Sequence, residues 1–224
     1  MTALPAAGQS AALVLHGPAG AIEAVLAMPA NPAGPRGLAV VCHPHPLYGG
    51  TLDNKVVTTL ARCGTEAGLA SLRFNFRGVG RSEGHFDQGE GETEDALAVL
   101  DWGLQALALR HWAWLGFSFG GMVAVRAAAQ RRPEQLVTVA PALYAFGDAI
   151  PTPGCPWLLI HGRDDDVVDC QKTVARVQGQ APPVDLRLLD GTGHFFHGRL
   201  GDLRSIVTPV LRERWRELPA ARGV

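Results

Sequence analysis

The chain has 224 residues, of which 47% are apolar and 18% are charged, and its formal net charge is −1 at pH 7. This length and composition are typical of a globular protein, so we expect a single domain over residues 1–224. Because the sequence has no excess of basic residues, neither nucleic acid nor an anionic membrane is an expected partner.

The four cysteines, Cys42, Cys63, Cys155 and Cys170, are scattered along the chain and form no C-x-x-C pair. Their spacing indicates neither a zinc site nor a disulfide framework, so we expect free thiols in a reducing compartment. The opening residues lack the basic region and the long apolar core of a signal peptide, and there is no run of about 18 apolar residues. The sequence therefore predicts a cytoplasmic protein without a membrane span.

Apolar runs bounded by glycine and proline predict the strands. The first two runs are separated by Gly17-Pro18-Ala19-Gly20, which predicts a hairpin, and several later runs are continuously apolar, as in buried strands. The expected strands are Ala11–His16, Ala21–Met28, Leu38–Cys42, Leu69–Phe76, Trp112–Leu115, Leu136–Ala140, Trp157–His161 and Val184–Leu189.

Helices are expected between most of these strands. Helix-capping residues and acidic first turns indicate where some of them begin. The expected helices run from Thr51 as the cap to about Cys63 or Glu66, from the acidic turn Glu92–Asp95 to about Leu109, over Gly121–Ala129, over Asp169–Val177, and from about His197 to Leu218.

Two strands followed by repeated strand–helix units predict an α/β fold. We expect a doubly wound, mostly parallel sheet with helices on both faces and an antiparallel edge at the N-terminal hairpin. Only about fifteen residues separate the strand that ends near Ala140 from the strand that starts near Pro156, which is too few for a lid domain. A functional site in this fold would be open to solvent except where loops cover it.

The segment HWAWLGFSFGG, residues 111–121, contains a G-x-S-x-G pentapeptide between an expected strand and an expected helix. In that context the pattern is typical of a nucleophile elbow, a sharp turn that exposes the serine hydroxyl. Gly116 and Gly120 leave room where the strand and the helix cross, and the helix N-terminus favours a developing negative charge. Ser118 is therefore the candidate nucleophile.

A serine hydroxyl needs a general base, and the base needs an acid that orients it. In an open parallel sheet, functional groups gather at the carboxyl ends of the strands. His194, in a glycine-rich loop after the last expected strand, is the candidate base. The preceding strand is followed by GRDDDVV, in which Asp164, Asp165 and Asp166 are all candidates for the acid.

The negative charge that develops on a carbonyl oxygen needs two backbone N–H donors. Phe119, directly after the candidate nucleophile, is expected to supply one of them. The other is expected from the loop HPHPLYGG, which follows the first parallel strand. Because Pro44 and Pro46 have no N–H, the donor in this loop is His45 or Leu47.

Five motifs in chain order, HPHPLYGGTLDNKVV, NFRGVGRSEG, GFSFGG, HGRDDDVV and GTGHFFHG, resemble those of the α/β-hydrolase superfamily along nearly the whole chain. More narrowly, they resemble small lidless bacterial serine hydrolases related to the dienelactone hydrolases. The resemblance implies that Asp165, three residues after the glycine of HG-x-x-D, is the acid, that His194 is the base, and that His45 is the second N–H donor. Dienelactone hydrolases carry a cysteine nucleophile, so their lactone specificity is not implied for Ser118.

The resemblance implies a serine hydrolase that cleaves small carboxylic esters through an acyl-enzyme, with no cofactor. Thioesters, peptides and lactones would use the same triad and stay open as substrates. A non-catalytic scaffold that binds a small ligand or a partner is the alternative of another class, although such scaffolds usually lack a triad member. The oligomeric state is not predicted. Aromatic residues beside the motifs are expected either to line the substrate pocket or to pack in the core: Tyr48, Phe117, Phe119, Phe195 and Phe196.

The histidines also raise the alternative of a metal site. His43, His45, His194 and His197 could supply ring nitrogens, and Asp165 a carboxylate. Because a serine elbow already accounts for His194 and Asp165, we predict no metal.

Overall fold

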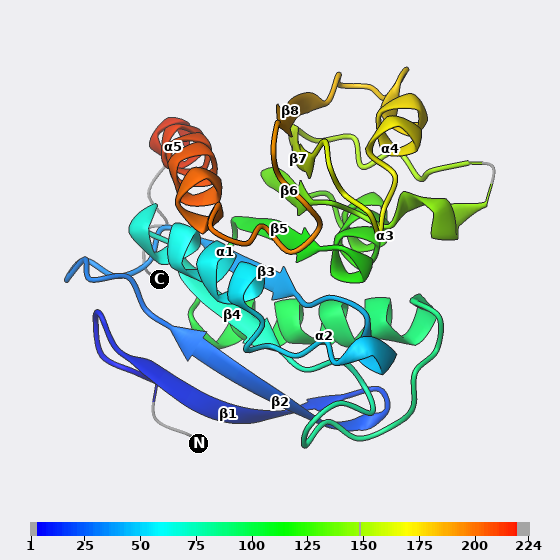
Figure 1. The fold of residues 1–224 in the computed structure, drawn as a ribbon. Coiled ribbons are helices and arrows are strands. Elements are labelled where there is room, and N and C mark those ends of the chain that lie inside the picture. Colours follow the sequence, from blue (N-terminus) through cyan, green and yellow to red (C-terminus); the bar gives the residue numbers. More distant parts are fainter. Residues whose placement is uncertain (1–3, 148, 219–224) are drawn as a thin grey trace.

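An eight-stranded sheet forms the centre of the computed structural model, which describes residues 4–147 and 149–218. The strand order is β1-β2-β4-β3-β5-β6-β7-β8 (Figure 1). β2 runs antiparallel to β1 and β4, and the other neighbours are parallel. The strands are β1 (Ser10–Gly17), β2 (Gly20–Ala27), β3 (Leu38–Cys42), β4 (Ala70–Phe74), β5 (Trp112–Phe117), β6 (Gln135–Val139), β7 (Trp157–Gly162) and β8 (Asp185–Leu189).

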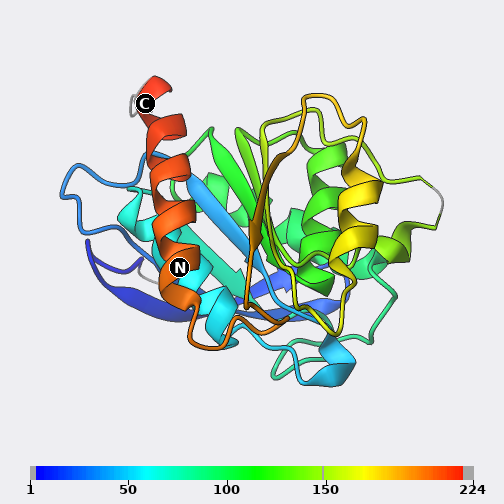
Figure 2. The same ribbon diagram turned by 45° about the horizontal axis from the view of Figure 1, so that its top comes forward.

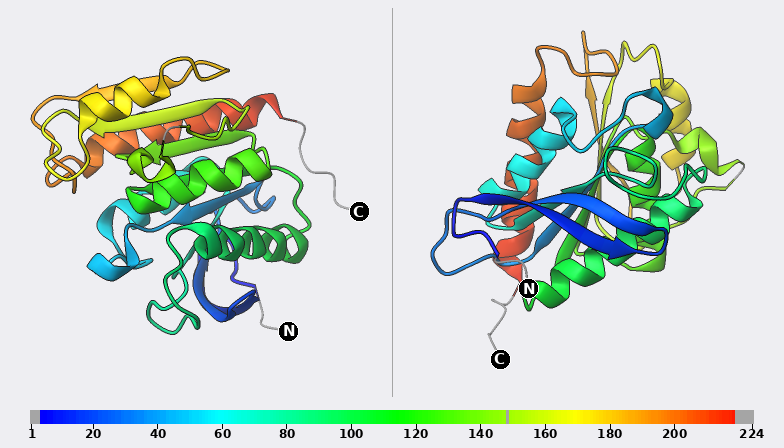
Figure 3. Two further views of the ribbon diagram at one scale, coloured as in Figure 1. Left: turned by 90° about the vertical axis from the view of Figure 1, so that its right-hand side faces the viewer. Right: turned by 90° about the horizontal axis from the view of Figure 1, so that it is seen from below.

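Helices cover both faces of the sheet, as the sequence predicts. α1 and α5 lie side by side on one face, and α2, α3 and α4 lie on the other (Figures 1 and 3). Figure 2 shows α5 and α4 on opposite sides of β8. The helices are α1 (Lys55–Glu66), α2 (Glu90–Ala106), α3 (Phe119–Gln130), α4 (Cys170–Val177) and α5 (Leu200–Glu217), with the short 3₁₀ helices η1 (Pro46–Tyr48) and η2 (Leu143–Phe146). The predicted α/β class, the mostly parallel sheet and its antiparallel edge are confirmed.

Packing on both faces fixes β5 in the middle of the sheet. Ala113, Leu115 and Phe117 are buried in the core under α1 and α5, whereas Trp114 is buried in the core on the opposite face. Burying a large apolar side chain contributes about 1.5–3 kcal/mol to the free energy of unfolding. The strand that leads into Ser118 is therefore held rigidly from both sides.

The first helix begins three residues later than an N-cap at Thr51 would place it. Asn54 is the N-cap of α1, and its side-chain oxygen accepts the N–H of Val56 at 2.9 Å. The Thr51 hydroxyl oxygen instead accepts the N–H of Asp53, at 3.3 Å, within the preceding turn. The prediction of Thr51 as the N-cap was therefore wrong. Threonine and asparagine are both good N-cap residues, so residue type alone does not decide between the two positions.

The last helix also begins later than expected. α5 begins at Leu200, so His197 is not a helix-start residue. The segment before α5 is a series of turns, in which the N–H of Phe196 donates to Gly193 O at 3.2 Å and the N–H of Arg199 donates to Phe196 O at 3.0 Å. These turns leave the residues after His194 in a loop.

The acidic residues of α2 fix the connection from β4 to α2. The carboxylate of Glu92 accepts the N–H of Gly89 at 2.8 Å and that of Asp87 at 2.9 Å. Asp95 binds the Arg77 guanidinium through both of its oxygens, at 2.9 and 2.8 Å, in the two-pronged geometry that favours strong pairing. The connection is thereby held against the loop that follows β3, where Phe86 meets His45.

The connection between β6 and β7 is short. The described residues of that connection, 140–147 and 149–156, form only the short helix η2 in addition to turns and extended chain. In residues 4–147 and 149–218, no helix is both long and apolar enough to cross a membrane.

Candidate active site

Ser118 lies at a sharp turn between β5 and α3. Its φ of 54° and ψ of −118° are strained for a residue with a side chain. The surrounding backbone holds this conformation, because the N–H of Ser118 donates to Val139 O at 2.9 Å and its carbonyl accepts the N–H of Ala142 at 3.1 Å. The turn therefore has the form of a nucleophile elbow.

The two glycines of the pentapeptide lie where the predicted crowding occurs. A Cβ on Gly116 would lie 2.2 Å from Gly120 O. A Cβ on Gly120 would lie 2.3 Å from the carbonyl oxygens of both Cys42 and His43. These contacts are with backbone atoms, which have no side-chain rotamer to adjust. The close crossing of β3, β5 and α3 consequently requires glycine at both positions.

Ser118, His194 and Asp165 form a continuous hydrogen-bonded line. His194 Nε2 lies 3.0 Å from Ser118 Oγ, and His194 Nδ1 lies 2.8 Å from Asp165 Oδ2. Ser118 comes from the elbow, Asp165 from the loop after β7 and His194 from the loop after β8, at the carboxyl ends of parallel strands. Ser118 is only 8% exposed and His194 only 3%, so the line is shielded from bulk water.

Of the three adjacent carboxylates, only that of Asp165 points inward. Its side chain is fully buried, and its Oδ1 accepts the N–H of Val167 at 2.9 Å and that of Val168 at 2.7 Å. Asp164 and Asp166 are exposed, and neither contacts His194. The hydrogen bonds from these two N–H groups to Oδ1 fix the carboxylate with its other oxygen, Oδ2, toward His194.

The carboxyl of Asp165 is held in its charged form. Burial by itself would raise its pKa, but hydrogen bonds from His161, His194 and the N–H of Val168 outweigh burial and hold the pKa well below its usual range. Asp165 is consequently a carboxylate at neutral pH. It accepts hydrogen bonds there and has no proton to donate.

A second histidine contacts the same carboxylate. His161 Nε2 lies 3.1 Å from Asp165 Oδ2 and 3.0 Å from Val168 O, so it carries a proton that both oxygens accept. Its other ring nitrogen, Nδ1, is buried and has no hydrogen-bond partner among the residues that the structure describes. The sequence places His161 only at the end of an expected strand and indicates no partner for it.

The backbone N–H groups of Phe119 and His45 are the candidate donors to an oxyanion. Neither donates to an acceptor within residues 4–147 and 149–218. The N–H of Leu47 instead donates to the His45 ring nitrogen Nδ1, at 3.2 Å. Because its N–H is occupied, Leu47 is a poorer candidate than His45 for the second donor to an oxyanion.

His43 and His197, two further histidines of the metal alternative, have partners outside the candidate triad. His43 is buried, its Nε2 accepts the N–H of Phe76 at 3.0 Å, and its Nδ1 lies 2.6 Å from Pro44 O. His197 stacks against Phe195 in the loop before α5. Across the described ranges, no group of three or more His, Cys, Asp or Glu side chains is arranged to hold a metal ion.

Two clefts open beside Ser118. One, of about 370 Å³, has His194, Phe195 and Asn54 in its wall, and we call it the His194 cleft. The other, of about 550 Å³, has Phe119, Phe86 and Tyr144 in its wall, and we call it the Phe119 cleft. Both share His45, Tyr48, Ser118 and Val167.

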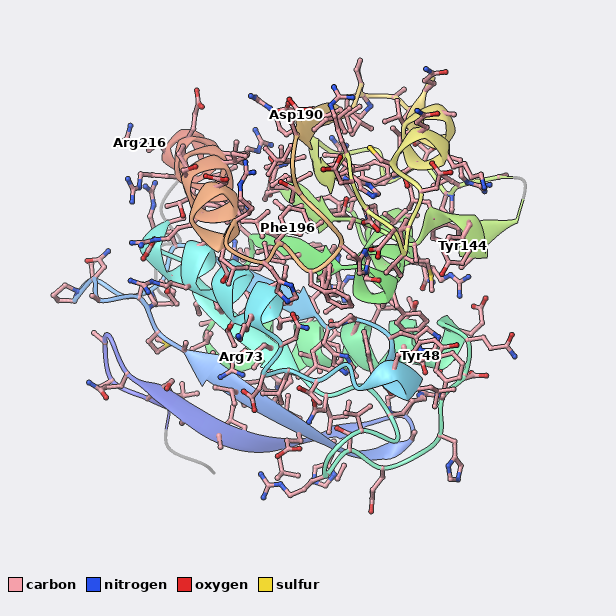
Figure 4. The ribbon with its side chains drawn as sticks, viewed as in Figure 1. Tyr48, Arg73, Tyr144, Asp190, Phe196 and Arg216 are labelled. Atoms are coloured by element: carbon pink, nitrogen blue, oxygen red, sulfur yellow. The ribbon has the colours of Figure 1, made fainter. Side chains whose placement is uncertain are left out.

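The structure separates the aromatic residues whose role was left open between pocket and core. Tyr48, Phe119 and Phe195 line the clefts, whereas Phe117 and Phe196 are fully buried in the core. The sequence did not indicate that Phe86, Gln88 or Tyr144 would line a cleft, because none of them lies within one of the five motifs. Figure 4 shows Tyr48 on η1 and Tyr144 on η2 at the same side of the molecule.

Comparison with known proteins agrees with this fold. The model of the α/β hydrolase fold family matches residues 45–144. An uncharacterized protein of Rickettsia prowazekii, RP471, is 35% identical over 212 residues, which are 89% of this chain and 87% of the relative. The chain belongs to the α/β-hydrolase family.

Solved structures narrow the family further. A serine hydrolase without a lid from Xanthomonas campestris, XC6422, is 38% identical, with a TM-score of 0.86 over 94% of this chain and 97% of that one. An alpha-beta serine hydrolase homologue from Coxiella burnetii is 39% identical, with a TM-score of 0.84 over 90% of this chain and 97% of the other. The protein is thus a homologue of lidless serine hydrolases, and the predicted resemblance to this superfamily is confirmed.

Proposed function

We propose that the protein is a serine hydrolase of small carboxylic esters. The observation that carries the proposal is the hydrogen-bonded line from Ser118 Oγ through His194 to Asp165. In the first step, Ser118 Oγ attacks the ester carbonyl carbon while His194 Nε2 takes the hydroxyl proton. The carbonyl π electrons move to the oxygen, which the N–H groups of Phe119 and His45 bind.

The tetrahedral intermediate then expels the alcohol. His194 returns the proton to the leaving oxygen as the C–O bond breaks, and an acyl-Ser118 ester remains. His194 next takes a proton from water, whose oxygen attacks the acyl carbon, and a second collapse releases the acid and restores the Ser118 hydroxyl. Asp165, charged and fixed by its backbone contacts, orients the imidazole and stabilises the imidazolium formed in each half.

Several observations favour small esters over other functions. The clefts are open because no lid covers them, which suits small or end-exposed esters. The homologues from Xanthomonas campestris and Coxiella burnetii are described as serine hydrolases, which supports hydrolysis over a non-catalytic scaffold. Thioesters, peptides and lactones would be cleaved by the same steps, and direct comparison of matched substrates separates them.

Replacement of the nucleophile tests the proposal. Ser118→Ala should lower the hydrolysis of p-nitrophenyl acetate by at least about 10⁴-fold, since it removes the oxygen that forms the acyl-enzyme. It should also abolish labelling by a fluorophosphonate. Ser205→Ala, at an exposed serine of α5, is the matched control and should behave as the wild type. Unchanged labelling of Ser118→Ala, or a wild type inert to every activated ester, would refute the proposal.

A further inference from the structure

The two clefts meet at the candidate nucleophile but differ in one catalytic group. The imidazole of His194 is part of the wall of the His194 cleft and is absent from that of the Phe119 cleft. Phe119, whose N–H is free to bind an oxyanion, lines only the Phe119 cleft. An ester bound at Ser118 has two substituents on its reacting carbon, and each cleft has room for one of them.

Proton transfer decides which substituent enters which cleft. The leaving alcohol oxygen must receive a proton from His194 Nε2 as the C–O bond breaks, so it lies within hydrogen-bond reach of that atom. The substituent on this oxygen then extends along the wall formed by His194, Phe195 and Asn54. The acyl substituent points away from His194, into the cleft lined by Phe119, Phe86 and Tyr144.

The Phe119 cleft is lined with aromatic rings. The ring of His45 lies 4.9 Å from that of Phe86 and 5.0 Å from that of Phe119, and the Phe86 and Phe119 rings are 5.7 Å apart. Tyr144, 64% exposed, adds a ring at the open side. These separations lie in the range in which aromatic rings attract one another, and a further ring entering the cleft would meet both faces and edges.

An acyl group in the Phe119 cleft would meet no charged side chain of the described residues. Among the residues that the structure describes, the wall of the Phe119 cleft holds no lysine, arginine, aspartate or glutamate, and its polar side-chain groups are the Tyr48 and Tyr144 hydroxyls, the His45 ring nitrogens, the Gln88 amide and the Ser118 hydroxyl. A carboxylate on the acyl group would lose hydration there without gaining a cation. The cleft therefore suits an uncharged acyl group.

The geometry points to a division of the site into two subsites: the Phe119 cleft binds an uncharged aromatic acyl group, and the His194 cleft binds the leaving alcohol. This inference rests on the proposed ester hydrolysis and adds the substrate class. Tyr144 and Phe195 are the residues that report on it, because each lines one cleft only and is at least half exposed.

The test uses the matched variants Tyr144→Leu and Phe195→Leu, with Val14→Ala, on the exposed face of β1, as a remote control. Acyl preference is the ratio of kcat/KM for p-nitrophenyl benzoate and p-nitrophenyl cyclohexanecarboxylate, whose acyl rings differ mainly in aromaticity. Alcohol preference is the ratio for 1-naphthyl acetate and phenyl acetate. Hydrolysis of the benzoyl-enzyme, followed after a burst of p-nitrophenol, is a third readout, because the alcohol has already left.

We expect Tyr144→Leu to lower the benzoate preference by about 2–10-fold, the effect of losing one aromatic pair, and to change the rate of benzoyl-enzyme hydrolysis. The alcohol preference should stay the same. Phe195→Leu should change the alcohol preference by a similar factor and leave benzoyl-enzyme hydrolysis within about twofold of the wild type. That third readout also shows whether the substitution disturbs His194, which must activate water in the same step.

Three results would overturn the division into subsites. Tyr144→Leu could change the alcohol preference and Phe195→Leu the acyl preference, both variants could change one ratio equally, or neither variant could change either ratio. Failure of the proposed function would give different experimental results. A wild type that hydrolyses no activated ester, or a Ser118→Ala variant that hydrolyses phenyl acetate as well as the wild type, overturns both proposals. Normal Ser118-dependent hydrolysis without the predicted partition overturns only the subsites.

Discussion

His161 and His194 hydrogen-bond to the same oxygen of Asp165. His194 Nδ1 lies 2.8 Å from Oδ2, and His161 Nε2 lies 3.1 Å from the same oxygen. The carboxylate charge that would stabilise a His194 imidazolium is therefore shared with a second donor. His161 is fully buried at the end of β7, so it cannot turn away from this contact without disrupting the core.

This sharing predicts that His161 is a positioning residue whose loss changes the pH dependence of hydrolysis. His161→Leu removes the donor, leaves more negative charge on Asp165 and stabilises the His194 imidazolium. The acid limb of the kcat/KM profile should then move to higher pH by up to about one pH unit, equivalent to about 1.4 kcal/mol. His161→Gln retains an N–H donor and should move the limb less.

A purely structural role for His161 would give a different result. Loss of packing would lower kcat/KM by the same factor at every pH and would lower the thermal midpoint in both variants. Superimposable pH profiles for His161→Leu and the wild type would contradict the shared-oxygen account.

Neutralising Asp165 tests which of the three adjacent carboxylates is the acid. Asp165→Asn keeps the shape but removes the charge that stabilises the imidazolium, so kcat for p-nitrophenyl acetate should fall about 10⁴-fold. Asp164→Asn and Asp166→Asn make the same chemical change at exposed side chains and serve as matched controls. The kcat of each should stay within about twofold of the wild type. A large loss in either neighbour would move the assignment away from Asp165.

The second oxyanion donor can be tested by removing a backbone N–H. His45 has a φ of −54°, within the range that proline imposes, and its N–H bonds no other residue in the described part of the chain. His45→Ala and His45→Pro both remove the ring, but only the proline variant also removes the N–H. We expect kcat of His45→Pro to be about 10²–10³-fold below that of His45→Ala. Equal rates would point to Leu47 as the donor.

The parts of the candidate site that depend on local chain geometry could be predicted from the sequence. Ser118 and His194 were placed at strand ends because apolar runs and glycines mark the ends of β5 and β8. The crowding predicted at Gly116 and Gly120 is present, because a strand and a helix joined by one tight turn must cross closely. Spacing alone could not separate Asp165 from its neighbours, since that choice depends on which side chain the loop turns inward.

Contacts between distant segments could not be predicted in the same way. Tyr144 reaches the Phe119 cleft from η2 and Phe86 reaches it from the connection between β4 and α2, and only the folded sheet brings them together. The contact of His161 with Asp165 depends on how the loop after β7 closes over the strand end. The capping of α1 by Asn54 depends on the path of the preceding turn, because Thr51 is an equally good cap by residue type.

Burial of His43 predicts a measurable pH dependence of stability. Burial lowers its pKa to about 4, so between that value and the ordinary value of 6.5 the unfolded chain binds a proton that the folded chain does not. The free energy of unfolding should therefore fall by about 3 kcal/mol as the pH falls from 6.5 to 4, and this contribution should end below about pH 4. His43→Gln lacks the titrating group, so its free energy of unfolding, measured by urea denaturation at each pH, should fall correspondingly less than that of the wild type. His85→Gln, at an exposed histidine, is the matched control and should follow the wild type. Parallel curves for His43→Gln and the wild type over this range would show that the buried imidazole is not the source of the acid sensitivity.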